Sequence, residues 1–130
     1  MGKKILIVDD EKEICELVCE GLRNAGYDAV FTTASDEALD IASKEKPDLV
    51  ILDIHMPRMD GVSIYERLRK DAIHRYTPII FLTVLAQGSR PRLAGLKNDD
   101  AYSVIPKPAT IEQVESEVER LLRQRASFKS

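Results

Sequence analysis

Three short apolar runs, separated by segments with helical periodicity, constrain the fold of this chain more than any other feature. The runs cover residues 5–8, 49–52 and 79–82, and each is apolar throughout. Such runs are typical of strands that are buried on both faces, as in parallel sheets covered by helices. Two weaker runs, at residues 29–32 and 104–106, complete a set of five predicted strands.

Helical segments alternate with these strands. Residues 11–25, 35–44 and 62–70 carry apolar positions that are three and four residues apart, which is the period of an amphipathic helix. The stretch 86–103 is rich in loop-forming residues, and within it only residues 92–96 can hold a short helix. A fifth and longer helix follows the last strand.

Capping signals mark the amino-terminal starts of two predicted helices. Ser35 is a candidate for the N-cap of the second helix, because its hydroxyl can accept a hydrogen bond from a free backbone N–H. Thr110 and Gln113 have the spacing of a capping box and open the last helix. We expect one domain over residues 1–125, followed at 126–130 by a disordered tail or the start of a linker.

The regular alternation of strands and helices predicts an α/β protein. Right-handed crossovers between parallel strands place helices on both faces of the sheet. The expected architecture is therefore a three-layer α/β/α sandwich with a five-stranded parallel sheet and five helices. In such sheets, ligands bind outside the carboxyl ends of the strands.

Charge and hydropathy exclude several classes of function. A net charge of -3 argues against nucleic-acid or anionic-membrane binding over the whole surface. The longest apolar runs have four to five residues, far short of the ~20 that span a bilayer. The N-terminus lacks a signal-peptide pattern. Cys15 and Cys19 have no further soft ligand nearby, so we expect packed thiols and a cytoplasmic location.

Polar residues of a particular kind follow four of the predicted strands. Asp9 and Asp10 follow the first strand, Asp53 the third, Thr83 the fourth and Lys107 the last. Each residue alone has an ordinary explanation, such as a cap or a solvated charge. Because the carboxyl ends of parallel strands share one edge of a sheet, we expect all of them to meet at a single site.

The chemistry of these groups favours a hard cation and phosphoryl transfer. Carboxylates crowded at one edge repel, so they must be partly protonated or share a cation. Few oxygen ligands with room for water suit Mg²⁺ better than Ca²⁺. No glycine-rich loop follows the first strand, which argues against a nucleotide site. With a cation bound, Asp53 can attack a phosphoryl group whose other oxygens are stabilised by Lys107 and Thr83.

The sequence around these residues resembles the receiver domain of two-component response regulators. The resemblance covers residues 3 to about 124 and is most specific around Asp53, where Met-Pro and Asp-Gly follow the aspartate. The matching segments are residues 5–11, 47–61, 78–83 and 107–108. The resemblance implies a CheY-like, flavodoxin-type sheet with strand order 2-1-3-4-5.

The resemblance also implies roles for the acidic residues. Asp53 would accept a phosphoryl group from the phosphohistidine of a sensor histidine kinase or a histidine phosphotransfer protein. Asp10 would bind Mg²⁺ directly, and Asp9 directly or through water. Asp53 and the backbone carbonyl of His55 would complete the protein ligands.

The basic and hydroxyl residues would respond to the phosphoryl group. Thr83 would hydrogen-bond it, Lys107 would pair with it, and the Lys107–Pro108 bond corresponds to the family's cis peptide. Such a protein is no enzyme beyond catalysing its own phosphorylation and dephosphorylation. Its output would be a change in the surface of the fourth helix, fifth strand and fifth helix. A partner or a missing C-terminal output domain would read that change.

This chain departs from the family pattern mainly on the output surface. Val104 stands where an aromatic switch residue is usual, and Tyr102 lies one pleat away on the same face of the strand. Tyr102 or Val104 is therefore the candidate switch residue together with Thr83. Val84 follows Thr83 where small residues are common, and we expect it to restrict access to the phosphoryl group.

Two alternative functions follow from the same residues. The altered segment 84–104 favours a phosphorylation-independent, pseudo-receiver interaction module. A phosphatase of the haloacid dehalogenase type would need an acid where this chain has His55, whose side chain we expect to be solvated. His74 lies in a polar stretch and is expected at the surface. Homodimerisation, which is common in the family, is a further form of output that the resemblance allows.

Overall fold

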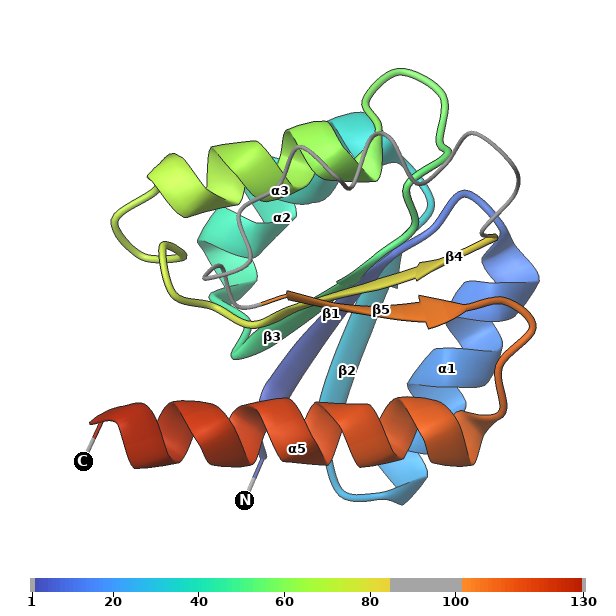
Figure 1. Ribbon diagram of the computed structural model, residues 1–130. Coiled ribbons are helices and arrows are strands. Elements are labelled where there is room, and N and C mark those ends of the chain that lie inside the picture. Colours follow the sequence, from blue (N-terminus) through green and yellow to red (C-terminus); the bar gives the residue numbers. More distant parts are fainter. Residues whose placement is uncertain (1, 85–101, 130) are drawn as a thin grey trace.

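The computed structural model describes residues 2–84 and 102–129, which form one five-stranded parallel sheet covered by helices (Figure 1). The strand order is β2-β1-β3-β4-β5, as the family resemblance implied. The strands are β1 (Lys4–Val8), β2 (Asp28–Thr32), β3 (Leu49–Leu52), β4 (Ile79–Thr83) and β5 (Tyr102–Pro106).

Helices cover both faces of the sheet and make it the middle of three layers. In Figure 1, α2 and α3 lie over one face, and α1 and α5 lie over the other. The described helices are α1 (Lys12–Asn24), the short 3-10 helix η1 (Ser35–Glu37), α2 (Ala38–Glu45), α3 (Gly61–Lys70) and α5 (Ile111–Lys129). The helix predicted at residues 92–96 lies outside the described residues.

The core is divided by the sheet into two apolar clusters. Along β1, Ile5 and Ile7 belong to the cluster beneath α1 and α5, whereas Leu6 and Val8 belong to the cluster beneath α2 and α3. All four are at most 1% exposed. A strand that alternates between two buried layers must be apolar at every position, which explains why the strand sequences show no polar alternation.

Most predicted boundaries agree with the structure, and the last strand and helix extend beyond them. β5 begins at Tyr102 and ends at Pro106, which is tolerated because this strand forms an edge of the sheet. The capping box is confirmed: the backbone N–H of Thr110 donates to Gln113 Oε1 at 2.8 Å, and that of Gln113 to Thr110 Oγ1 at 3.1 Å. The α5 backbone is helical through Lys129, past the predicted boundary at 125.

Both cysteines pack in the core, as predicted. Cys15 is fully buried and donates its thiol proton to the Asp9 carbonyl at 3.3 Å, and Cys19 is 2% exposed. Burial raises the pKa of Cys15 to about 12. Both are free thiols. Among the residues that the structure describes, no helix is long and apolar enough to cross a membrane.

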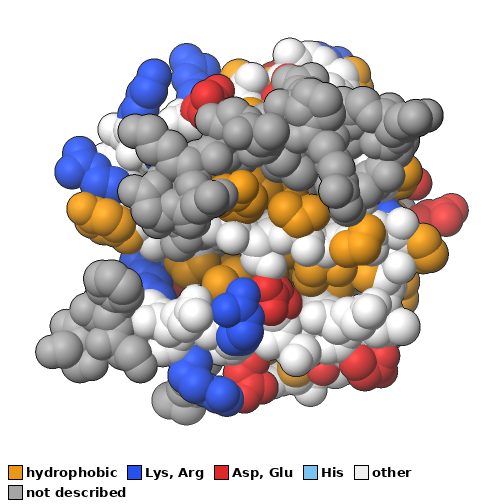
Figure 2. Space-filling model, viewed as in Figure 1, with side chains coloured by type: hydrophobic (Ala, Val, Ile, Leu, Met, Phe, Trp, Pro, Cys, Tyr) orange, Lys and Arg blue, Asp and Glu red, His pale blue; other side chains and the backbone are white. Residues whose placement is uncertain are grey.

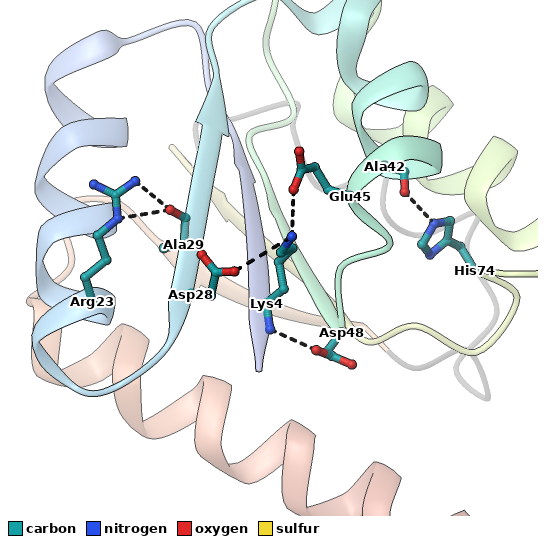
Figure 3. Close-up of polar contacts among 8 residues, drawn as sticks. All are labelled: Lys4, Arg23, Asp28, Ala29, Ala42, Glu45, Asp48 and His74. Atoms are coloured by element: carbon teal, nitrogen blue, oxygen red, sulfur yellow. Dashed lines mark hydrogen bonds and ion pairs between the residues drawn. The ribbon is translucent and has the colours of Figure 1, made fainter. Parts of the chain in front are cut away.

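His74 contradicts its prediction, because it is 1% exposed and not at the surface. Its Nε2 lies 3.0 Å from the Ala42 carbonyl on α2 (Figure 3). Its Nδ1 lies 3.1 Å from Thr77 Oγ1. A carbonyl can only accept, so Nε2 carries the proton. The Arg69 guanidinium donates to the carbonyls of His74 and Thr77 at 3.2 and 2.8 Å. These bonds tie the segment after α3 to α2.

A second polar network fastens the amino ends of the strands. Lys4 Nζ lies 2.7 Å from Glu45 and 3.7 Å from Asp28, and the Lys4 backbone N–H donates to Asp48 at 2.8 Å (Figure 3). One residue thereby joins β1 to β2, to the end of α2 and to the start of β3. The side chain of Arg125 reaches the same region from α5 and donates to the Asp48 carbonyl at 3.0 Å.

Candidate functional site at the carboxyl edge of the sheet

The strand-end residues meet at the carboxyl edge of the sheet. Asp9 follows β1, Asp53 follows β3 and Lys107 follows β5, and the strands run parallel, so all of these ends lie at one edge. Carboxylate oxygens of Asp9, Asp53 and two neighbours, Asp10 and Glu11, lie within 4.8 Å of one another. The predicted acidic cluster is therefore present, and it has one member, Glu11, to which the sequence assigned no role.

Lys107 supplies the positive charge at the centre of this cluster. Its Nζ lies 2.8 Å from Asp9 Oδ2, 3.0 Å from Glu11 Oε1 and 3.5 Å from Asp53 Oδ2. Its side chain is only 9% exposed. Burial lowers the pKa of Lys107, but its hydrogen bonds to Asp9 and Glu11 and the charge of Asp53 outweigh burial and raise the pKa above 10.5. The ammonium is therefore a permanent charge in the site.

The contact with Lys107 does not fully offset the cost of burying the Asp9 carboxylate. The residue is 2% exposed, and burial raises its pKa, although the Lys107 ammonium and the Glu11 backbone N–H oppose that shift. Repulsion from Asp53 adds to the effect of burial. Asp10, by contrast, is exposed. Four carboxylates around one ammonium can accommodate a hard cation, with Asp10 on the solvent side and Asp9 beneath it.

The Asp-Gly pair after Asp53 positions the amino end of α3 behind the site. Asp60 caps α3 by accepting a hydrogen bond from the Ser63 backbone N–H at 2.9 Å. A Cβ at position 61 would lie 2.1 Å from the Asp53 carbonyl oxygen, so only glycine fits here. The Gly61 backbone N–H also donates to the Ile54 carbonyl at 3.0 Å. Helix and strand end are therefore held in direct backbone contact.

Ser35 does not cap a helix, which corrects the sequence-based prediction. It lies within η1, and neither η1 nor α2 has a side-chain cap. The buried Ser35 hydroxyl instead donates to the Pro57 carbonyl at 2.5 Å and accepts from the Met59 backbone N–H at 3.2 Å. Ser35 therefore shapes the loop that carries His55. No local signal reveals this contact, because the partners lie more than twenty residues away along the chain.

Thr83 ends β4 next to the acidic cluster and is fully buried. The β3–β4 register pairs Leu52 with Phe81, so the strand ends that carry Asp53 and Thr83 adjoin. Within the described part of the chain, the Thr83 hydroxyl has no hydrogen-bond partner. A buried hydroxyl without a partner is costly, and an added acceptor at this edge would satisfy it. A phosphoryl oxygen is such an acceptor.

Two further predicted features near the site are confirmed. The Lys107–Pro108 peptide bond is cis, and the His55 side chain is exposed, as expected. Val84, at 52% exposure, lines an apolar groove of about 570 Å³ that opens beside Lys107. The groove also contains Leu17 of α1, which is 58% exposed although it occupies an apolar position of the predicted helix. Sequence periodicity alone did not predict this groove.

The two candidate switch residues share one face of β5, as predicted. Val104 pairs with Phe81 in the sheet, and Tyr102 pairs with Ile79. The Tyr102 ring meets the rings of Phe81 and Tyr65 edge-on, each at 5.7 Å. Figure 2 shows acidic and basic side chains intermingled over α5, with apolar side chains beside them. The choice between Tyr102 and Val104 stays a prediction.

Sequence comparison places this architecture among signalling proteins. The family described as response regulator receiver domain matches residues 5–119. The alkaline phosphatase synthesis transcriptional regulatory protein PhoP of Bacillus subtilis is 36% identical over 124 residues, covering 95% of this chain and 50% of that protein. The probable transcriptional regulator ycf27 of Porphyridium aerugineum is 38% identical over 122 residues, covering 93% and 48%. The chain thus spans about half the length of these relatives.

Solved structures share the fold over nearly the whole chain. The signal receiver domain of a signal transduction histidine kinase from Syntrophus aciditrophicus has a TM-score of 0.85 and 31% identity, covering 95% of this chain and 92% of that one. A putative response regulator from Chloroflexus aurantiacus has a TM-score of 0.83 and 28% identity, covering 95% and 99%.

Proposed function

The chain belongs to the response regulator receiver domain family, and we propose that it is a phosphorylation-controlled switch in which Asp53 accepts the phosphoryl group. Members of this family are signalling proteins and not classical enzymes. The observation that carries the proposal is the convergence of Asp53, Lys107 and the buried, unpartnered Thr83 hydroxyl at one edge of the sheet. A nucleophile, a cation and a hydrogen-bond donor are thereby available to one phosphoryl group.

The acidic cluster fits the divalent cation that receiver domains generally bind. Four carboxylates within 4.8 Å of one another carry more negative charge than the Lys107 ammonium balances. Asp9, Asp10 and Asp53, with the backbone carbonyl of His55, would hold Mg²⁺. When bound, Mg²⁺ withdraws charge from the oxygens of the transferring phosphoryl group.

Asp53, Lys107 and Thr83 would each have a separate role in the phosphoryl transfer. A carboxylate oxygen of Asp53 attacks the phosphorus of a phosphohistidine, and the bond from phosphorus to the histidine nitrogen breaks with its electron pair on nitrogen. Lys107, now 3.5 Å from Asp53, pairs with a phosphoryl oxygen, and the Thr83 hydroxyl donates to another. The Asp53 side chain is only 7% exposed, so the attacking carboxylate is largely shielded from solvent.

The groove beside the site supports a protein as phosphodonor. Leu17 and Val84 are both more than half exposed and line this groove together with Lys107, whose ammonium contacts Asp53. A sensor histidine kinase or a histidine phosphotransfer protein would cover this apolar groove on docking. We infer that Val84 is a contact for the donor as well as a restriction on access to the phosphoryl group.

The relatives named above as transcriptional regulators are about twice as long as this chain. We therefore propose a cytoplasmic protein whose phosphorylated β5–α5 surface acts on an output domain or a separate partner, while this domain itself contacts no nucleic acid and no membrane. Homodimerisation through that surface is one form such an output can take.

A phosphorylation-independent interaction module is the second candidate. It is favoured by the aliphatic Val104 at the switch position and by the packing of Tyr102 against two other rings. This alternative predicts that partner binding is unchanged in Asp53→Ala.

Intact-mass measurement with acetyl phosphate and Mg²⁺ tests the leading proposal. We expect one added phosphoryl group on the chain, none in Asp53→Ala, and one in Asp48→Ala, where an aspartate is lost from the opposite edge of the sheet. An adduct that persists in Asp53→Ala, or no adduct with any donor, would contradict the proposal.

A further inference from the structure

Glu11 is the member of the acidic cluster that the proposed chemistry does not use. Its Oε1 lies 3.0 Å from Lys107 Nζ, while its side chain is 60% exposed. It is the residue before the first turn of α1, yet its side chain does not cap that helix. Its backbone N–H donates to Asp9 Oδ1 at 2.9 Å, which fixes Glu11 against the cluster. The carboxylate therefore pairs with Lys107 and does not cap the helix.

Lys107 and a divalent cation compete for the same carboxylates. The ammonium is 2.8 Å from Asp9 and 3.5 Å from Asp53, and both carboxylates are proposed metal ligands. Two cations on one pair of buried carboxylates repel each other strongly. When the metal binds, the contacts of Lys107 with Asp9 and Asp53 must therefore weaken, and the ammonium needs another carboxylate as its partner. Within the described residues, the other carboxylate paired with Lys107 is that of Glu11.

We propose that Glu11 is a positioning residue that retains Lys107 while Asp9 and Asp53 take up the divalent cation. Glu11 thereby sets the affinity of the site for Mg²⁺ and keeps the ammonium close to Asp53 for the phosphoryl group. This inference rests on the metal site of the proposed function. It adds to that site a residue whose partner is the lysine and not the metal.

Calorimetric titration with Mg²⁺ tests the inference through binding alone. We expect Glu11→Gln to weaken Mg²⁺ binding by about fivefold, since Lys107 then stays on Asp9 and Asp53. The matched control is Glu13→Gln, which removes an equal charge from an exposed position in the first turn of the same helix. We expect this control to change the affinity by less than about twofold, because solvent screens a distant surface charge.

A Lys107→Met background separates retention of the lysine from direct metal ligation. Without the ammonium, Glu11→Gln should change Mg²⁺ affinity by less than about twofold, because the competing cation has been removed. A fivefold loss that persists in this background would make Glu11 a ligand and would overturn the proposal. Equal effects of Glu11→Gln and Glu13→Gln would overturn it as well. Wild-type protein that binds no Mg²⁺ would instead remove the metal site of the proposed function, a distinguishable failure.

Discussion

The two edges of the sheet each have a lysine among carboxylates, and the two lysines have different surroundings. At the amino edge, Lys4 pairs with Glu45 and Asp28 and is 28% exposed (Figure 3). At the carboxyl edge, Lys107 is 9% exposed and contacts three of four clustered carboxylates. The first arrangement joins strands and helices to one another. The second concentrates charge in one place, and this is the pattern of a site that does chemistry.

Electrostatics sharpens the contrast. The hydrogen bond to Glu45 raises the pKa of Lys4, so the ionised pair is favoured at the amino edge. At the carboxyl edge, burial raises the pKa of Asp9 even though Lys107 is in contact with it. The charges at the amino edge are balanced by one another. At the carboxyl edge, an added cation would stabilise the ionised carboxylates. The amino edge therefore contributes to stability, and the carboxyl edge carries the proposed function.

His74→Ala should have the largest effect on stability and should leave the chemistry intact. The substitution opens a cavity and leaves the Ala42 carbonyl and the Thr77 hydroxyl without their buried partner. We expect a loss of about 3 kcal/mol in the free energy of unfolding, measured with urea. Arg75→Ala, an exposed neighbour, should lose less than about 0.5 kcal/mol. Phosphorylation of the folded His74→Ala protein should equal that of wild type, and its loss would break the division between the edges.

Gly61→Ala should affect stability and chemistry together. The new Cβ would lie 2.1 Å from the Asp53 carbonyl oxygen, so the backbone behind the phosphoacceptor must move, at a cost of about 2 kcal/mol. Gly21→Ala is the matched control, because its Cβ would clash equally closely, but with the Ile111 side chain and not with the backbone of the site. We expect slower phosphorylation by acetyl phosphate in Gly61→Ala but not in Gly21→Ala. Equal rates in both variants would contradict the proposed role of the Asp-Gly pair.

The sequence predicted the fold and most of the site because those features depend on local patterns. Apolar runs define the strands, and their polar ends define the site once the strands are parallel. The Thr110–Gln113 capping box is likewise a local pattern. His74 and Ser35 were wrongly predicted because their partners, Ala42 and Pro57, lie 32 and 22 residues away in the chain. The sequence around a polar side chain does not indicate that its partner is a buried carbonyl far away in the chain.

Glu11 illustrates the same limit within the site itself. Its position after Asp10 placed it near the cluster, but its contact with Lys107 joins residues that are 96 apart in sequence. Only the assembled sheet brings β1 and β5 ends close enough for that pair, although the two strands are not neighbours in it. Local periodicity equally could not indicate that Leu17 faces solvent at the groove.

Asp9→Asn should have the smallest effect on the free energy of unfolding. We expect it to increase that free energy, which shows that the carboxyl edge is not optimised for stability. Burial raises the pKa of Asp9 above 3.8 in the folded chain, so the folded chain binds that proton more readily than the unfolded chain. The ionised carboxylate therefore costs stability at neutral pH, and the cost shrinks as pH falls through the raised pKa. We expect Asp9→Asn to unfold at higher urea concentration than wild type near pH 7, with the difference shrinking toward about pH 4.

The control for this experiment is Asp40→Asn, which changes an exposed residue of α2. It should not raise the urea midpoint at neutral pH. A wild type that is more stable than Asp9→Asn near pH 7 would show that the carboxyl edge is already satisfied by Lys107, and the contrast between the two edges would be lost.

Locating the phosphoryl group by chemical trapping is the most direct measurement of the central claim. Borohydride reduces an aspartyl phosphate to homoserine, and peptide mass spectrometry of the phosphorylated chain then identifies the residue. The division between the edges predicts homoserine at Asp53 alone among the 11 aspartates of the chain. Homoserine at any other aspartate, or none in a chain exposed to donor and Mg²⁺, would contradict it.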